Sequence, residues 1–351
     1  MHLFEHHRLA PYTTLNLGGP ARYFTEAPSV EALRESLQWA RDRDLPVWIL
    51  GGGSNVVFPD AGFPGLVIRI GIGGIDADPA FPGRYRVAAG VDWDRFVSRA
   101  VTDGAAGIEC LSGIPGTAGA TPIQNVGAYG QEVSQTIREV HCLERTTLET
   151  RTFGVEECAF AYRQSRFKHA ERDRYVVLRV DFQLEPGGEA TIRYAELNAD
   201  VERAGGLKGL PAAEALSLVR ERVLGLRRGK SMVLDPADPN TRSAGSFFLN
   251  PVVSAEAFRA IEERWAAGGG GAIPAFPAGD QVKVPAAWLV EHAGFGKGYR
   301  RGSAGVSTRH SLALVNYGES AADLLALAAE IRDGVEKTFG IPLEPEPVIV
   351  R

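Results

Sequence analysis

Two glycine-rich loops hold the residues whose types and spacing could do chemistry. The first loop, Gly51 to Asn55 (GGGSN), follows an apolar strand predicted over residues 46–50. Successive backbone N–H groups without Cβ atoms can curl around an anion, so this loop could bind a diphosphate. It does not open a helix and contains no Lys-Ser/Thr pair, so it is neither a dinucleotide fingerprint nor a Walker loop. A tight turn between two strands is the alternative interpretation.

The second loop covers residues 115–130 and is irregular, apolar and rich in Gly, Ala and Pro. Its first part, PGTAGATP, permits close approach of the backbone to a ligand. Gln124 and Asn125 follow, and their side-chain amides offer donors and acceptors suited to a flat heterocycle. A long irregular segment of this kind is usually functional when it is ordered. Together the two loops favour a cofactor that has both a diphosphate and a ring system.

Apolar periodicity predicts the elements that must position these loops. Helices are expected after caps at Ser29 and Ser254, over residues 92–103, around residues 216–226, and over residues 321–339. Strands are expected over residues 46–50, 66–70, 85–89, 139–144 and 175–184. The pattern predicts an α+β fold in which residues 1–200 hold the glycine loops and residues 201–351 hold most of the later helices.

Composition excludes several classes of function. The chain has 351 residues, a formal net charge of -5 and a pI of about 5.9, so it has no broad basic field for binding nucleic acid. The three cysteines form no Cys-x-x-Cys pair and are expected to be buried thiols. The seven histidines are scattered, so no metal site is expected. With neither a signal peptide nor a membrane helix in the pattern, we expect a soluble cytoplasmic protein.

Five motifs along the chain carry a family resemblance. They are GGGSN at 51–55, IPGTAGATPIQNVGAYGQE from residue 114, AYRQSRFK at 161–168, AGSFFLNP at 244–251 and LEPE at 343–346. In this order they resemble the successive signatures of the UDP-N-acetylenolpyruvoylglucosamine reductases. The resemblance implies a non-covalent FAD in a two-lobed domain of the vanillyl-alcohol-oxidase (PCMH) type over residues 1–200, with the lobes divided near residue 72. It implies a substrate-binding domain over residues 201–351 and NADPH as the hydride donor.

The implied reaction reduces the enolpyruvyl ether of UDP-N-acetyl-3-O-(1-carboxyvinyl)-glucosamine to UDP-N-acetylmuramate, a precursor of peptidoglycan. Hydride addition at the terminal carbon places negative charge on the carbon beside the carboxylate, which calls for a cation, an acid and a proton donor. By resemblance, Arg163 is the cation, Glu346 the acid and Ser246 the proton donor. Without the resemblance, a surface ion pair, a solvated tail charge and a backbone-bonded serine are the simpler interpretations.

The resemblance also assigns residues to cofactor and substrate. The predicted FAD-binding residues are Gly51, Gly52, Gly53, Ser54, Asn55, Pro115, Gly116, Thr117, Gly119, Ala120, Ile123, Gln124, Asn125, Gly127, Tyr129 and Gly130. The predicted substrate-binding residues are Tyr194, Lys230, Asn250 and His310. Some relatives have glutamine near position 310, and the stretch between Lys230 and Ser246 is longer than in some relatives.

Two other functions share part of this pattern. An FAD-dependent sugar or lactone oxidase of the same fold needs the glycine loops but neither Ser246 nor Glu346. A non-catalytic flavin or nucleotide-sugar binding protein would keep Tyr194 and Lys230 and tolerate loss of Ser246. The complete set of three catalytic residues favours the reductase, acting on a small nucleotide sugar as a monomer with no obligate protein partner and no membrane or nucleic-acid contact.

Overall fold

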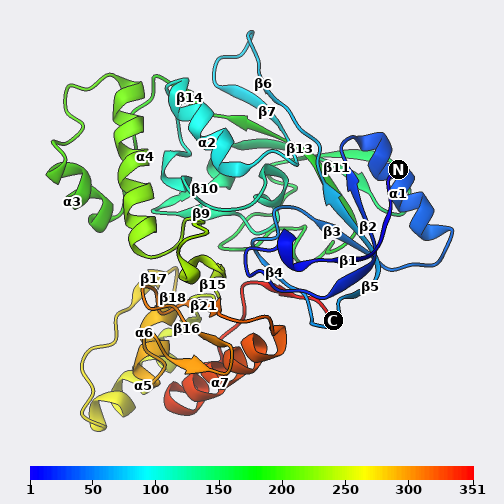
Figure 1. Cartoon of the computed structure of the whole chain (residues 1–351). Helices are drawn as coiled ribbons and strands as arrows, with labels where there is room; N and C mark the ends of the chain where they lie inside the picture. The colour runs from blue at the N-terminus through cyan, green and yellow to red at the C-terminus, as the bar shows by residue number, and fades with distance from the viewer. The chain divides into compact units, whose positions relative to one another are not determined.

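The computed structural model describes all 351 residues, Met1–Arg351, and divides the chain into two compact units (Figure 1). Unit 1 comprises Met1–His7, Ala21–Gly53 and Phe63–Val233. Unit 2 comprises Arg8–Pro20, Ser54–Gly62 and Leu234–Arg351. Each unit mixes helices with strands, which confirms the predicted α+β class. Each unit therefore combines segments that are distant in the sequence.

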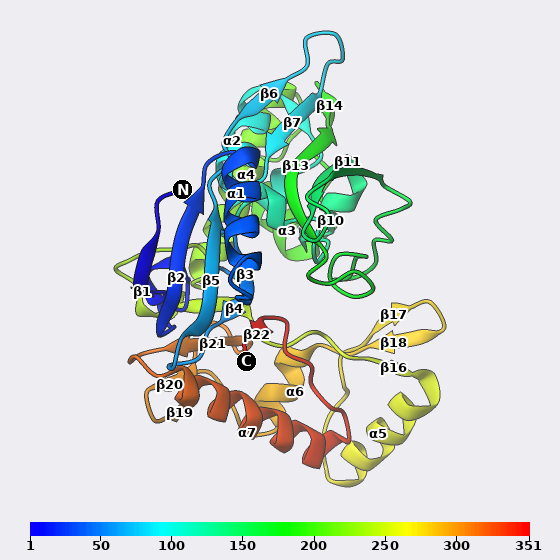
Figure 2. The same ribbon diagram turned by 90° about the vertical axis from the view of Figure 1, so that its right-hand side faces the viewer.

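The first sheet of unit 1 has the strand order β1-β2-β5-β3. Its strands are β1 (Phe4–Arg8), β2 (Pro20–Ala27), β5 (Phe63–Ile70) and β3 (Val47–Leu50), and β5 pairs in parallel with both β2 and β3. Helix α1 (Val30–Arg41) packs against β5 (Figure 2). As predicted, Ser29 caps α1, and its side chain accepts a hydrogen bond from Ala32 N.

The second sheet of unit 1 is antiparallel and has the order β12-β11-β13-β7-β6. Its strands are β12 (Thr150–Gly154), β11 (Ile137–Glu144), β13 (Tyr175–Gln183), β7 (Arg84–Ala88) and β6 (Ile75–Ala77). Helix α2 (Trp93–Thr102) places Trp93 and Phe96 against Phe182 of β13. The chain passes from the first sheet to the second between Ile70 and Ile75.

Helices α3 (Ala195–Arg203) and α4 (Ala212–Gly229) complete unit 1. Leu197 and Val201 of α3 pack with Val219 and Val223 of α4 around the buried Cys110. Four short strands form two further pairs, β8 (Ala105–Ala106) with β14 (Glu185–Pro186), and β9 (Gly127–Ala128) with β10 (Gln131–Glu132). Residues 201–233 thus group with unit 1 by contact, while the division of function at residue 200 stays a prediction.

Unit 2 is built on a four-stranded antiparallel sheet of order β15-β21-β20-β19. Its strands are β15 (Ser243–Ser246), β21 (Ala313–Asn316), β20 (Ala304–Val306) and β19 (Arg300–Arg301). A smaller sheet contains β16 (Val252–Ser254), β18 (Gln281–Lys283) and β17 (Phe276–Ala278). The helices are α5 (Ala255–Ala267), α6 (Ala286–His292) and α7 (Ala321–Phe339). Helix α7 contributes seven residues to the buried apolar core of this unit.

Within unit 2, a short strand near residue 350 pairs with a short strand near residue 56. Strand β22 (Val348–Ile349) pairs in parallel with β4 (Val56–Val57). The pairing continues on either side, because Val348 N donates to Asn55 O and Val350 N donates to Val57 O, each at 3.0 Å. The residues after the first glycine loop are thereby fixed to those around Glu346.

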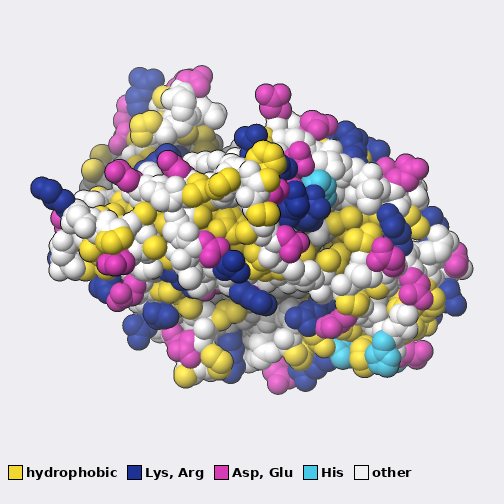
Figure 3. Space-filling view, turned by 90° about the horizontal axis from the view of Figure 1, so that it is seen from above, with side chains coloured by type: hydrophobic (Ala, Val, Ile, Leu, Met, Phe, Trp, Pro, Cys, Tyr) yellow, Lys and Arg dark blue, Asp and Glu magenta, His cyan; other side chains and the backbone are white.

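The surface and the cysteines agree with the composition. Acidic and basic side chains are interspersed on the face shown in Figure 3, with no single basic patch. All three cysteines are buried and unpaired, as predicted, and burial raises the pKa of Cys110 and of Cys158 to about 12. None of the helices combines the length and the hydropathy that a membrane span requires.

Candidate functional site

The two glycine loops meet within unit 1 at Gly52 and Gly116. A Cβ atom added to Gly52 would lie 2.7 Å from Gly116 Cα, and one added to Gly51 would lie 2.9 Å from Thr117 Oγ1. Carbon atoms normally approach no closer than about 3.5 Å, so the space between these backbones excludes a side chain. The first loop is therefore more than a tight turn, since glycine is required there to bring two backbones together.

The second loop is held in place from the sheet side. Gly116 O accepts a hydrogen bond from Trp93 N at 3.0 Å, Ala118 N donates to Val91 O at 2.8 Å, and Gly119 N donates to Ala89 O at 3.0 Å. A Cβ atom on Gly119 would lie 2.4 Å from that of Ala89, so the loop lies directly on the end of β7. These bonds leave the opposite side of the loop to face Gly51 and Gly52.

Asp94 fixes the entry to the second loop. Its carboxylate accepts hydrogen bonds from Gly113 N at 2.6 Å and from both Nη atoms of Arg220 at 2.6 and 2.7 Å. Burial alone would raise the pKa of Asp94, but the bonds from Arg220 and Gly113 outweigh it and the pKa lies below its ordinary value. Helix α4 thus braces the second loop by a charged pair that the sequence alone did not indicate.

Asn125 is buried and uses its side chain to hold the second loop. Its Nδ2 donates to Glu132 Oε2 at 2.9 Å and to Ala161 O at 3.1 Å, while its Oδ1 accepts from Ser134 N at 3.1 Å. Both amide N–H donors are therefore used within the protein. Any contact of Asn125 with a heterocycle would therefore be made by its backbone. The neighbouring side chains of Gln124 and Ile123 are more exposed.

Arg163 clamps the same loop from the AYRQSRFK segment. Its Nη1 donates to Asn125 O at 3.1 Å and its Nη2 donates to Gly127 O. Asn125, Tyr129 and Arg163 all have positive φ angles of 45 to 54°, which non-glycine residues rarely adopt. Such strain persists where surrounding structure enforces it and concentrates at functional sites. The predicted cation thus lies against the predicted cofactor loop.

Tyr194 and Lys230 lie at the edge of unit 1 formed by α3 and α4. Tyr194 is 52% exposed, and its ring makes an edge contact with that of Tyr129, with centroids 5.9 Å apart. Burial raises the pKa of Tyr129 to about 12. Lys230 Nζ forms an ion pair with Glu196 at 2.7 Å. One predicted substrate residue thus touches a predicted cofactor residue, and the other is paired on the neighbouring helix.

Unit 2 brings Ser246, Glu346 and Asn55 into one place. Ser246 ends β15, and the next residue accepts a hydrogen bond at Phe247 O from Glu346 N at 2.8 Å. Asn55 Nδ2 donates to Glu346 O at 3.3 Å. Glu346 is half-buried, whereas Glu344 is exposed. Three motifs separated along the sequence therefore converge within this unit.

The remaining predicted substrate residues have structural partners in unit 2. Asn250 Oδ1 accepts a hydrogen bond from Ala286 N at 2.9 Å and so caps α6. His310 lies in the turn between β20 and β21. That turn is tied to Asn240, whose Oδ1 accepts hydrogen bonds from Thr308 N at 3.0 Å and from Ser307 Oγ at 3.2 Å. Sequence reasoning missed Asn240, because a lone asparagine in a polar stretch carries no distinctive pattern.

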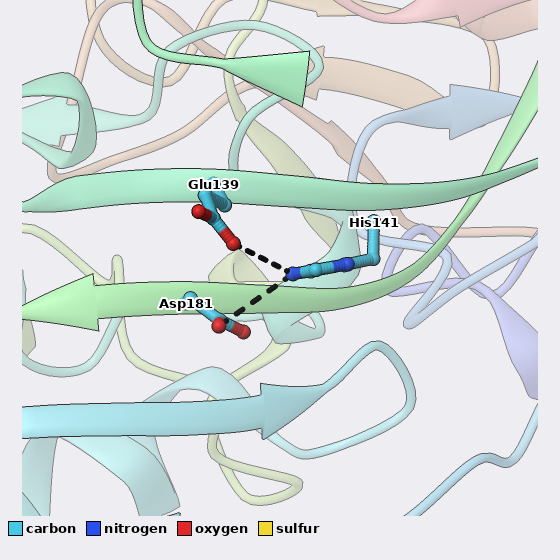
Figure 4. Close-up of side chains that lie close together, drawn as sticks. All are labelled: Glu139, His141 and Asp181. Carbon is cyan, nitrogen blue, oxygen red and sulfur yellow. Dashed lines mark ion pairs between the residues drawn. The ribbon is translucent and has the colours of Figure 1, made fainter. Parts of the chain in front are cut away.

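A separate polar cluster lies on the second sheet of unit 1. His141 Nε2 is 3.3 Å from Glu139 and 3.5 Å from Asp181, which project from β11 and β13 (Figure 4). One ligand atom from each of the three residues lies within 4.8 Å of the others, a grouping that the histidine spacing did not predict. Arg179 Nη2 also lies 2.8 Å from His141 Nε2, and Arg179 Nε lies 2.7 Å from Asp181. Because the Arg179 guanidinium already contacts both His141 and Asp181, the geometry favours an ion-pair network over a metal site.

Comparison with known proteins gives full-length matches. Residues 236–350 match the profile of the UDP-N-acetylenolpyruvoylglucosamine reductase C-terminal domain, and residues 21–148 match an FAD binding domain. The UDP-N-acetylenolpyruvoylglucosamine reductase of Thermobifida fusca (strain YX) is 50% identical over 350 residues, covering 97% of this chain and 96% of the relative. That of Streptomyces coelicolor is 51% identical, covering 97% of this chain and 88% of the relative.

A solved structure has the same fold. The crystal structure of the UDP-N-acetylenolpyruvylglucosamine reductase from Thermus caldophilus is 24% identical and superposes with a TM-score of 0.65, covering 100% of this chain and 98% of that one. The likeness in fold and the match to an FAD binding domain confirm the predicted fold type and the predicted flavin cofactor.

Proposed function

The chain belongs to the UDP-N-acetylenolpyruvoylglucosamine reductases, and from that premise we propose that it reduces UDP-N-acetyl-3-O-(1-carboxyvinyl)-glucosamine to UDP-N-acetylmuramate with NADPH as the donor. The observation that supports this reading best is the convergence of Glu346, the strand ending at Ser246, and Asn55 within unit 2. An oxidase of the same fold requires neither the serine nor the acid. Their joint placement beside the continuation of the first glycine loop favours the reductase.

The glycine cradle is suited to FAD. A Cβ atom at Gly52 would collide with the backbone of Gly116, so the two loops can lie this close only because Gly52 has no side chain, and their backbone N–H groups are then unshielded for a diphosphate. The residues that would hold the cofactor are those predicted in the two loops, from Gly51 to Asn55 and from Pro115 to Gly130. When bound, the flavin supplies the hydride that NADPH has delivered to it.

The three catalytic residues act on the substrate carboxylate and on the carbon beside it. Arg163 holds a permanent positive charge that stabilises the negative charge gained at the carboxyvinyl group. Glu346, the proposed acid, favours the enolic form by donating a hydrogen bond from its carboxylic acid group to the substrate carboxylate. Ser246 donates a proton to the carbon beside the carboxylate, since a carbanion-like carbon is far more basic than a serine alkoxide. Arg163 and Ser246 thus act on the negative charge that grows as hydride is transferred, which is where stabilisation speeds the reaction.

Polar and charged side chains are needed to hold the nucleotide half of the substrate. We propose that Tyr194 and Lys230 contact the diphosphate and that Asn250 and His310 contribute further polar contacts. The ion pair of Lys230 with Glu196 holds the lysine side chain at the end of α4. The enzyme would act as a cytoplasmic monomer, with NADPH and the nucleotide sugar using one cavity in turn.

The test is a coupled measurement on the FAD-loaded chain. Mixing the protein with NADPH and the enolpyruvyl sugar should oxidise the nicotinamide and form UDP-N-acetylmuramate in equal amounts, with NADPH competing against the sugar. Omitting the sugar is the first control, and Ser246→Ala is the second, because it removes the proposed proton donor while leaving the flavin loops intact. NADPH oxidation that is independent of the sugar, with no reduced product, would contradict the proposal and favour an oxidase.

A further inference from the structure

Glu109 is a carboxylic acid with no exposed surface, close to the second glycine loop. Its Oε2 accepts a hydrogen bond from Gly107 N at 2.7 Å. Its Oε1 accepts two, from Gln131 Nε2 at 2.8 Å and from Thr191 N at 3.3 Å. Glutamate is almost never fully buried without such partners, because an acid removed from water is costly unless it is hydrogen-bonded. The contacts of Glu109 therefore indicate what it holds in place.

The two groups that share Oε1 come from the two predicted binding regions of unit 1. Gln131 directly follows Gly130, the last predicted cofactor residue, and its Oε1 accepts a hydrogen bond from Cys110 N at 2.8 Å. Thr191 lies three residues before Tyr194, and its carbonyl accepts a weak hydrogen bond from Cys110 Sγ at 3.7 Å. One carboxylate oxygen thus connects the cofactor loop with the segment that leads to the substrate tyrosine.

That segment, Gly187 to Tyr194, is here called the Tyr194 arm. It has no regular secondary structure and is mostly exposed, and it runs from β14 to the start of α3. Beyond Thr191, Arg193 Nη1 donates to Gly130 O at 3.3 Å, and the Tyr194 ring touches Tyr129. The bond from Thr191 N therefore ties this mostly exposed arm to a fully buried carboxylate.

We infer that Glu109 is a positioning residue for substrate binding, which acts by fixing the Tyr194 arm against the loop from Gly127 to Gln131. This inference rests on the proposed function, because it takes Tyr194 as a residue that contacts the substrate. Because one oxygen accepts both hydrogen bonds, a shift of the loop at Gln131 would move the oxygen that holds Thr191. Occupation of the cofactor loop and the position of Tyr194 are coupled through this carboxylate.

The first test is Glu109→Gln in the FAD-loaded full chain. Glutamine keeps the size of the side chain, but its NH2 group must face either Gly107 N–H or the Gln131 and Thr191 donors, so at least one hydrogen bond is lost. The KM for the nucleotide sugar should rise about 10-fold, the result expected for one lost hydrogen bond to a charged group. The rate of flavin reduction by NADPH should not change, and trypsin should cleave faster after Arg193. Glu189→Gln, an exposed change on the same arm, should leave all three measurements unchanged.

A double-mutant cycle with Tyr194→Ala separates positioning from a general structural role. If Glu109 acts through Tyr194, Glu109→Gln should raise the KM in the parent chain but not in the Tyr194→Ala chain. An equal rise in both backgrounds overturns the inference. If Glu109→Gln does not fold, Thr191→Pro removes the same N–H donor from the exposed arm and should raise the KM and the cleavage rate alike.

Failure of the inference is distinguishable from failure of the proposed function. If the parent chain does not reduce the enolpyruvyl sugar at all, the proposed function is wrong. If the parent turns over and Tyr194→Ala raises the KM, but neither Glu109→Gln nor Thr191→Pro changes the KM or the cleavage after Arg193, only the inference is wrong.

Discussion

Replacing Gly52 by alanine should weaken FAD binding while leaving the fold intact. The new Cβ atom would lie 2.7 Å from Gly116 Cα and 3.1 Å from Gly116 C, and both of these are backbone atoms. Ordinary carbon contacts are about 3.5–4.0 Å, so the two loops must separate by roughly 1 Å. Overpacking of this size costs about 1–3 kcal/mol. The free protein can relieve the contact by letting the loops part, but the bound state needs them at their present spacing.

The cost should therefore appear in binding, as a Kd for FAD about 5- to 150-fold higher than that of the parent. Fluorescence titration of the flavin-free protein measures the Kd, and thermal unfolding without FAD reports any loss of stability. The matched control is Gly225→Ala, because Gly225 lies within α4, has no positive φ and has no atom within 4 Å of its Cβ position. That change should leave the Kd unchanged and stabilise the helix by about 0.5–1 kcal/mol. A Gly52→Ala chain that binds FAD as tightly as the parent would show that the two loops are not the walls of one site.

Three further predictions address the proposed chemistry and the support of the loops. Arg163→Ala and Glu346→Gln should each slow flavin reoxidation by the sugar about 10²–10³-fold. The Arg163 variant should also weaken FAD binding, since two loop carbonyls lose their donor. Stopped-flow absorbance separates the two half-reactions, and a normal rate of reoxidation would show that the replaced residue has only a structural role. Ser246→Ala should be reduced by NADPH at the parent rate and then stall with the sugar, whereas Ser246→Cys should retain some turnover; if Ser246→Ala reoxidises normally, the proton comes from another group. Asp94→Asn should destabilise the chain at neutral pH. Because the pKa of Asp94 is depressed below 3.8 in the folded state, the stability that its carboxylate contributes is present above that pH and is lost as the pH falls through the folded pKa. The difference in Tm between parent and variant should therefore shrink below about pH 4, and a difference independent of pH would refute the charged pair as its source.

Local patterns explain which elements could be predicted from the sequence. Helix α7 has a serine cap, seven inward apolar or small residues and a left-handed glycine after its last turn, and its predicted bounds are confirmed. Helices α3 and α6 were not predicted, because neither has a clear apolar pattern. The α3 sequence AELNADVER buries only Leu197 and Val201, and α6 has only seven residues, which is too short for a periodic pattern to show.

Contacts between distant segments explain what could not be predicted. Nothing local to Asn55 indicates that its side chain meets the backbone of Glu346, or that residues 54–62 group with unit 2 while Gly51 to Gly53 group with unit 1. Such placements arise from pairing across most of the chain, which leaves no periodicity in either segment. Glu109 offered a weak signal, as a charged residue in an apolar stretch that proved to be fully buried.

The parallel pairing of β4 with β22 has a consequence for the order of folding. These two-residue strands lie near opposite ends of the chain, so bringing them together closes one of the longest loops available to it. Contacts of such large sequence separation cost entropy before they stabilise anything, and they form slowly unless earlier structure has already brought the segments close. Most of each larger sheet can assemble from nearer segments, whereas β22, which follows Glu346, can pair only after β4 has been brought close to it. We therefore expect the other sheets to form before the segment around Glu346, the proposed active-site acid, reaches its place, so that a refolding chain regains secondary structure earlier than activity.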